Sequence, residues 1–295
     1  MPTTTSDGEA AASLDLRRRL GELLRSKVAG EDAADRGAQI WGKPGPRWFS
    51  RTDPIWRVHA DASMFAGGLA ALLLQSLHPL AMAGVAGHSG YRSDPWGRLQ
   101  RTSHYLAVTT YGTISDAEAA IATVRDVHSR VRGRDDQGRP YRASDPHLLT
   151  WVHIAEADSF LRAYQAFGAR PLTDDEADTY LAQIAIPGRL LGVPDPPTSV
   201  ADLAEQLHAY APELHASPAA LDAARFLLSE PPLPLVARPG YSALAAGAVA
   251  LLSHRARSML ELRVPALVVD LFGPALGGMS VGAVRWALAA VPDGR

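Results

Sequence analysis

Candidate chemistry begins with a histidine on the apolar face of a predicted helix. In TVRDVHSRVRG (residues 123–133), the apolar residues Ile121, Val124 and Val131 repeat at the spacing of one helix face. His128 lies four residues after Val124, so it shares that face. A histidine there either donates a hydrogen bond to a backbone carbonyl within the core, or it offers a neutral imidazole as axial ligand to a buried haem iron. The residues alone favour the first interpretation and leave the second open.

A second histidine lies one helical turn before a carboxylate, in DPHLLTWVHIAEADSF (residues 145–160). His153 and Glu156 have the i, i+3 spacing found in carboxylate-bridged di-iron sites. Such a site needs two pairs and further acidic residues, and no second histidine is followed by glutamate at this spacing. We therefore expect His153 and Glu156 to bond to each other or to the backbone, and we keep His153 among the candidate cofactor-binding residues.

Two arginines and a threonine form the third group, in DPWGRLQRTSHYL (residues 94–106). Arg98, Arg101 and Thr102 lie at i, i+3 and i+4 of a predicted helix, with His104 and Tyr105 expected to point elsewhere. A solvated cationic face is the ordinary explanation, but two like charges one turn apart repel, and the flanking segments are apolar. Arginine can orient a carboxylate, a propionate or bound oxygen. We assign all three as candidate catalytic residues, and Arg98 also as a cofactor-binding candidate.

These side chains must be positioned by helices, and local signals predict where the helices begin and end. Residues 115–118 (SDAE) form a capping-box pattern ahead of His128, and Gly133 fits the position just past that helix. Residues 144–146 (SDP) open a helix predicted to end at Phe167. Thr173 begins a second capping box (TDDE), and Pro187 is expected to end its helix.

Prolines are also predicted to break the helices in the apolar parts of the chain. The apolar stretch 64–87 is predicted to break at Pro79, and the alanine-rich C-terminal third is predicted to break at Pro265 and Pro274. We find no run of alternating strands and no internal repeat. The sequence therefore predicts an all-α, multi-helical fold.

The length, composition and charge of the chain exclude several kinds of protein. The chain has 295 residues with 47% hydrophobic content, so we expect a disordered tail over residues 1–12 and a single domain over 13–295. A formal charge of −2 gives no basic field for nucleic acid or an anionic membrane. Because there is no cysteine, disulfides, zinc–thiolate sites and iron–sulfur clusters are excluded. Polar residues within the longest apolar stretch argue against an integral membrane span, and no signal peptide is evident, so we expect a cytoplasmic protein.

The ordered set of motifs resembles the haem-dependent oxygenase family that includes bacterial latex-clearing protein and the fungal MpaB oxygenase. The similarity runs through residues 53–102 and then through VRDVHSRVRG, YRASDPHLLTWVH, FLRAYQAFGARPL and IPGRLLGVPDPP. It covers most of residues 53–197, and the helical tail to about residue 291 is compatible with it.

This resemblance implies haem b in a helical, partly globin-like core, with His128 as the proximal ligand and metal-binding residue. Arg98, Arg101 and Thr102 match a distal Arg-x-x-Lys-Thr cluster of latex-clearing protein, whose lysine can ligate iron. Here Arg101 replaces that lysine, and an arginine holds its proton too tightly to be an ordinary ligand. We therefore expect an open or water-bound distal site, or one capped by another residue such as His104, and we do not transfer polyisoprene cleavage.

The leading hypothesis is a haem b-dependent oxygenase or peroxygenase that uses O2 on an apolar small molecule, unsaturated substrates included. One alternative is a non-catalytic helical carrier of haem or lipid. Another is a cofactor-free helical protein in which His128 is only a core histidine. The sequence leaves the oligomeric state open, because ALGGMSVGAVRWALAA (residues 275–290) can pack against a partner or against its own core.

Overall fold

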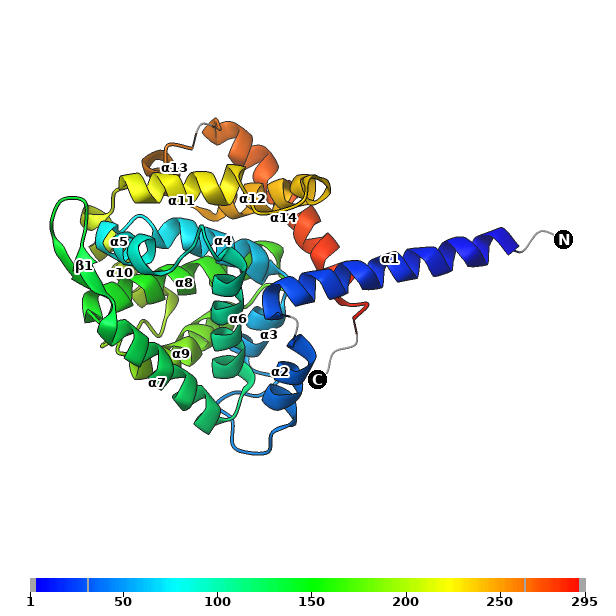
Figure 1. Cartoon of the computed structure of the whole chain (residues 1–295), viewed down its shortest axis with the longest axis horizontal. Coiled ribbons are helices and arrows are strands. Elements are labelled where there is room, and N and C mark those ends of the chain that lie inside the picture. Colours follow the sequence, from blue (N-terminus) through cyan, green and yellow to red (C-terminus); the bar gives the residue numbers. More distant parts are fainter. Residues whose placement is uncertain (1–3, 31, 263, 292–295) are drawn as a thin grey trace.

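The computed structural model of the chain describes residues 4–30, 32–262 and 264–291, and most of them lie in helices (Figure 1). The α-helices of these residues are α1 (Thr4–Ala29), α2 (Ala33–Gly42), α3 (Pro54–Ala60), α4 (Ser63–Gln75), α5 (Pro79–His88), α6 (Pro95–Tyr111), α7 (Ile114–Arg130), α8 (Pro146–Phe167), α9 (Asp174–Leu191), α10 (Val200–Tyr210), α11 (Pro218–Ser229), α12 (Arg238–Leu251), α13 (His254–Met259) and α14 (Ala266–Leu288). Two 3-10 helices, η1 (Ala211–Glu213) and η2 (Leu235–Ala237), and one antiparallel hairpin of β1 (Arg132–Arg134) and β2 (Pro140–Arg142) accompany them. The predicted all-α fold is confirmed.

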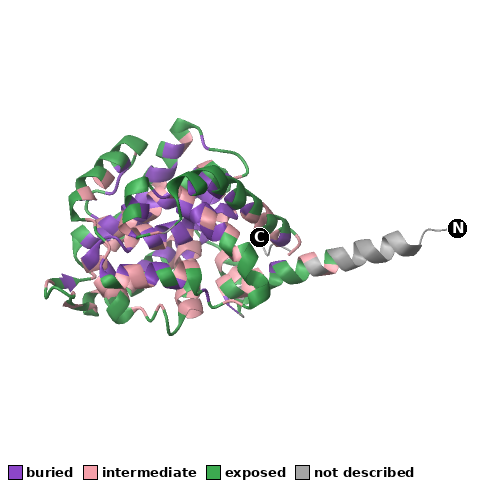
Figure 2. Ribbon diagram, turned by 90° about the horizontal axis from the view of Figure 1, so that it is seen from above, coloured by how far each residue is buried: buried purple, intermediate pink, exposed green. Residues whose placement is uncertain are grey.

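Buried residues gather in the middle of the helical body (Figure 2), and helix α8 is buried on most of its sides. Helix α4 packs closely along it: a Cβ added at Gly67 would lie 3.0 Å from the Cβ of Ala163, so a larger residue would force the two helices apart. The indole Nε1 of Trp151 donates to the backbone carbonyl of Gln75 at 3.0 Å and fixes the end of α4 against α8. The candidate residues of α8 therefore project from a tightly packed part of the core.

Side-chain caps begin two helices where the sequence predicts them. Asp145 accepts a hydrogen bond from a backbone N–H of the first turn of α8, with Pro146 in that turn, and α8 ends at Phe167 as expected. Thr173 and Glu176 form the reciprocal bonds of a capping box at the start of α9.

The ends of α7 differ from the prediction. Thr113 caps the helix instead of Ser115, because the Thr113 side chain accepts a hydrogen bond from the backbone N–H of Asp116. The helix ends at Arg130, and Gly133 lies in β1 instead of just past the helix. Strands of three residues are too short to show the alternation by which a strand is recognised in a sequence, so this hairpin was missed.

Prolines have different effects at different positions. The break at Pro79 is confirmed, with α4 and α5 bent by 109° to each other, and α14 begins directly after Pro265. Pro187 and Pro274 lie inside α9 and α14, so the predictions that they end or break a helix were wrong. A proline removes one helical hydrogen bond, and packing on neighbouring helices keeps both helices continuous. Helix α9 ends at Leu191 and is followed by Gly192, whose φ of +118° is a conformation that glycine adopts readily.

Helix α1 extends away from the body of the protein (Figure 1). A disordered tail was expected over residues 1–12. Residues 1–3 of it lie outside the described part of the chain. Helix α1 begins at Thr4, so no element boundary lies at residue 12. In its middle α1 contacts α14, where Arg17 Nε donates to the carbonyl of Trp286 at 2.7 Å. The assignment of residues 13–295 to one domain stays a prediction.

One face of α14 is apolar and exposed to solvent. Leu267, Leu271, Phe272 and Met279 are each more than half exposed. By length and composition α14 meets the criteria of a membrane-spanning helix, with 28% of its most apolar 18-residue window buried, and α4 and α5 meet them together as a bent pair. Such helices are weak indications, since core helices of soluble proteins meet the same criteria. The absence of an integral membrane span stays a prediction.

Candidate functional site

His128 projects from the last turn of α7 as a histidine without a partner. Its ring is half-buried, and its Nδ1 is closed to solvent and forms no hydrogen bond with any residue that the structure describes. Burial lowers the pKa of His128, so the imidazole is neutral at neutral pH. The carbonyl-bonded core histidine that the sequence favoured is not found. A neutral, unpartnered imidazole is what a buried metal centre takes as a ligand.

His153 projects from α8 and also lacks a hydrogen bond. Its Nε2 is closed to solvent without a partner in the described chain, and burial together with the charge of Arg189 lowers its pKa to about 4. The ring packs on α9, where a Cβ added at Gly188 would lie 2.8 Å from His153 Cε1. No hydrogen bond joins His153 to Glu156 among the bonds of the described residues, so that expectation was wrong. The two side chains are neighbours on one helix face that do not pair.

Glu156 is the acidic member of a buried polar group. Burial raises its pKa to about 7, and its charge, after burial, raises the pKa values of Tyr105 and Tyr180. His59 lies beside them, with Nδ1 2.8 Å from Thr110 Oγ1 and Nε2 3.4 Å from the Tyr180 hydroxyl. Burial lowers the pKa of His59 to about 3. At neutral pH His59 is therefore neutral, and the carboxyl group of Glu156 is close to half-protonated.

These side chains are surrounded by protein, yet each keeps part of its surface exposed. By surface area His59, Tyr105, His153 and Glu156 are only half-buried, yet burial is the largest influence on the pKa of each. We infer that these side chains line an enclosed hollow, because each keeps some exposed surface although protein surrounds it. The side chains of this group come from helices α3, α6, α8 and α9.

Sequence reasoning missed three members of this group, namely Tyr180, Tyr105 and His59. Tyr105 was expected to point away from Arg98, but it lies seven residues after Arg98, which returns it to the same helix face. The i, i+7 spacing could have revealed it. His59 lies on α3, a helix of 7 residues, which is too short to show a periodic pattern.

The predicted arginine–threonine group is only partly turned inward. Arg98 is half-buried and donates from Nη1 to Ser89 Oγ at 2.9 Å, and burial and the nearby charge of Arg101 lower its pKa. The Arg101 side chain is 66% exposed and pairs with Asp94 at 3.1 Å, and Thr102 is exposed. No hydrogen bond or ion pair of the described residues joins any of the three to His128. Arg98 is therefore the member that the fold turns toward the interior.

Two hollows that open to the surface lie elsewhere. One, of about 230 Å³, lies between α4, α8 and the segment around α13; the other, of about 380 Å³, is lined by Lys43, His104 and Asp116 among others. Neither is lined by His128, and His104, considered above as a distal cap, faces the second one. The fit of a cofactor to His128 therefore depends on its orphaned nitrogen and not on an open pocket.

The chemistry of three donors fits a haem, and it is judged residue by residue, because no hydrogen bond or ion pair of the described residues joins them to one another. His128 supplies one neutral imidazole, His153 supplies a second unpartnered nitrogen, and Arg98 supplies a positive charge that can pair with a propionate. A histidine imidazole is a common axial ligand of haem iron. The residues present fit the group.

Comparisons with known proteins place the chain in a family. The catalytic domain described as ER-bound oxygenase mpaB/B'/Rubber oxygenase matches residues 56–277. Two uncharacterised proteins, Mb2261 of Mycobacterium bovis and Rv2237 of Mycobacterium tuberculosis, are each 34% identical over 110 residues, which is 36% of this chain and 43% of each relative. The chain thus spans less than half the length of these curated relatives, and no solved structure matches it. Because the family match covers most of the chain, the protein belongs to the MpaB/rubber oxygenase catalytic-domain family.

Proposed function

We propose that this protein is a haem b-dependent oxygenase acting on an apolar small molecule, with O2 as co-substrate. The observation that carries the proposal is the enclosed, unpartnered Nδ1 of His128, on a helix of a chain that belongs to an oxygenase family. A buried polar atom without a partner is costly, and ligation of a metal is one reason for a fold to retain it.

The roles of the other residues follow from their contacts. His128 would hold the haem iron, and Arg98 would pair with a propionate or with charge that develops near the distal face. Arg101 lies at the surface and acts on Arg98 through its charge, and Thr102 beside it completes the proposed distal group. When bound, haem would supply the activation of O2 that protein side chains cannot provide.

Glu156 is suited to proton handling in this arrangement. With a pKa of about 7, its carboxyl group is close to half-protonated at neutral pH, so it can give or take a proton at one oxygen. Tyr105 and Tyr180 keep their hydroxyl protons, because burial and the Glu156 charge raise their pKa values. These groups can donate hydrogen bonds but do not compete with Glu156 as bases.

An apolar substrate is favoured by the charge state of the hollow. His59 and His153 are neutral at pH 7, since their pKa values are about 3 and about 4. Placing an ionic substrate against a lining that offers little compensating charge is unfavourable. A hydrocarbon-like molecule loses less hydration and gains from apolar contact.

The test is to express the full chain with haem precursor and to supply isotopically labelled O2 with a panel of apolar alkenes and alkanes. The proposal expects a haem-containing protein and label from O2 in a product, with less label incorporated per bound haem in Arg98→Met. Haem without any labelled product would favour the carrier hypothesis. Protein without haem would overturn the proposal.

A further inference from the structure

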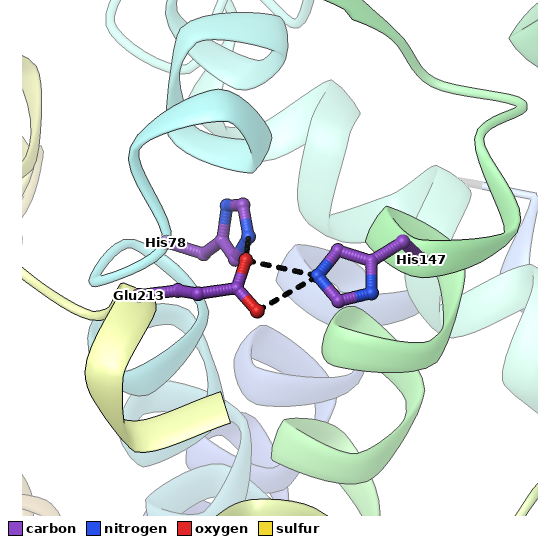
Figure 3. Close-up of side chains that lie close together, drawn as sticks. All are labelled: His78, His147 and Glu213. Atoms are coloured by element: carbon purple, nitrogen blue, oxygen red, sulfur yellow. Dashed lines mark hydrogen bonds and ion pairs between the residues drawn. The ribbon is translucent and has the colours of Figure 1, made fainter. Parts of the chain in front are cut away.

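Two histidines and a glutamate from three separate segments converge at one point of the surface (Figure 3). His78 lies at the break between α4 and α5, His147 in the first turn of α8, and Glu213 in η1. His147 Nε2 is 2.9 Å from Glu213 Oε2, and His78 Nε2 is 3.4 Å from the same oxygen. One potential ligand atom from each residue lies within 4.8 Å of the other two.

His147 meets Glu213 with one ring nitrogen and Tyr210 with the other. Its Nε2 lies 3.0 and 2.9 Å from the two Glu213 oxygens. On the other side of the ring, Nδ1 is 3.1 Å from the Tyr210 hydroxyl, which donates to the carbonyl oxygen of His147 at 2.8 Å. Because Nδ1 faces Tyr210, Nε2 is the nitrogen placed to share a cation with the carboxylate.

His78 adds an unsatisfied nitrogen aimed at the same place. Its side chain is 3% exposed, and both of its ring nitrogens are closed to solvent without a hydrogen bond, with Nε2 3.4 Å from Glu213 Oε2. A single divalent cation would bind Nε2 of His78, Nε2 of His147 and the carboxylate together.

The surrounding structure holds the three segments in place. The backbone N–H of His215 donates to the carbonyl of Leu77 at 2.9 Å, which joins the segment after Glu213 to the residue before His78. The Tyr210 ring stacks on the His147 ring, with centroids 4.5 Å apart. Tyr210 thus orients a ligating histidine through its second ring nitrogen, as outer residues of metal sites do.

We propose that His78, His147 and Glu213 bind one divalent first-row transition-metal ion, for which Zn2+ is the appropriate probe. Two imidazoles and one carboxylate are a standard ligand set for this class of ion. Tetrahedral zinc with bonds near 2.0–2.1 Å places its ligand atoms about 3.3 Å apart, close to the separations of 2.9 and 3.4 Å found here. Because His147 and Glu213 are exposed, the fourth position opens to water. The ion would link the α4–α5 break, the start of α8 and η1, independently of haem.

The experiment is a calorimetric titration of the purified, chelator-treated full chain with Zn2+, with zinc content measured after dialysis. We expect about one zinc per chain, and a melting temperature that rises on zinc addition, because the ion binds only the folded chain. His147→Ala and Glu213→Gln should each weaken zinc binding about tenfold or more. Both residues are exposed, so neither change should prevent folding.

His208→Ala and Glu205→Gln are the matched controls, since both residues are exposed on the adjacent helix α10 and lie outside the cluster. They should bind zinc as the unchanged chain does. A chain that retains no zinc, or four variants with the same affinity, would overturn the proposal and leave His147 and Glu213 as a surface pair without a metal. Haem content, measured in parallel, should be the same in all variants, so the outcome does not depend on the proposed oxygenase function.

Discussion

Replacing Glu156 by glutamine should remove a large part of the pH dependence of stability. Burial raises the pKa of this carboxyl from its ordinary value of 4.5 to about 7. Below pH 4.5 the group is protonated in the folded and the unfolded chain, so it adds no pH dependence. As the pH rises toward 7, the unfolded chain releases its proton and the folded chain keeps it, so stability falls and is lowest above the folded pKa. At 1.36 kcal/mol per pH unit, the full loss is roughly 3 kcal/mol.

The assay is urea unfolding of the unchanged chain and Glu156→Gln at pH 5 and pH 8. The free energy of unfolding of the variant, relative to the unchanged chain, should increase by roughly 2 to 3 kcal/mol between the two pH values. Glu205→Gln, at an exposed position, is the control and should change this difference little. If the unchanged chain and Glu156→Gln respond to pH in parallel, Glu156 titrates like a solvated carboxyl, and the enclosed hollow described around it is refuted.

Two further predictions concern packing. Gly188→Ala would bring a Cβ within 2.8 Å of His153 Cε1, so the free energy of unfolding measured with denaturant should fall by about 1–3 kcal/mol. Gly278→Ala is the control, because this position of α14 has open space around it, and its free energy of unfolding should rise by about 0.5–1 kcal/mol. Equal effects of the two changes would contradict the close packing at His153. Arg285→Lys should lower the melting temperature by loosening the two bonds that Arg285 donates to Asp61 at 2.8 and 3.1 Å, and an unchanged melting temperature would show that this pair holds α14 weakly.

Local signals in the sequence predicted many elements because they act within one turn of helix. Asp145 and Thr173 cap α8 and α9 with bonds to backbone groups two or three residues away, so their roles can be recognised without tertiary structure. At α7 the same reasoning predicted Ser115 as the capping residue, although the side chain of Thr113 makes the capping hydrogen bond. The prediction that Pro187 ends helix α9 failed for another reason, because packing against neighbouring helices outweighs the loss of one hydrogen bond.

The candidate site depended more strongly on contacts between distant segments. His128 could be selected by its place on an apolar helix face, but only the fold shows that its Nδ1 lacks a partner. The group of His78, His147 and Glu213 joins residues up to 135 positions apart in the sequence, and no spacing rule connects them. The inward turn of Arg98 and the exposure of Thr102 likewise follow from how α6 lies on its neighbours.

The most direct test of the central claim is the visible absorption spectrum of the purified chain, expressed with haem precursor, beside His128→Ala and the control His104→Ala. Ligation by His128 predicts a strong Soret band in the unchanged chain and in His104→Ala, and its loss in His128→Ala. A colourless unchanged chain, or a Soret band of equal strength in all three proteins, would contradict the assignment of His128 as the haem ligand.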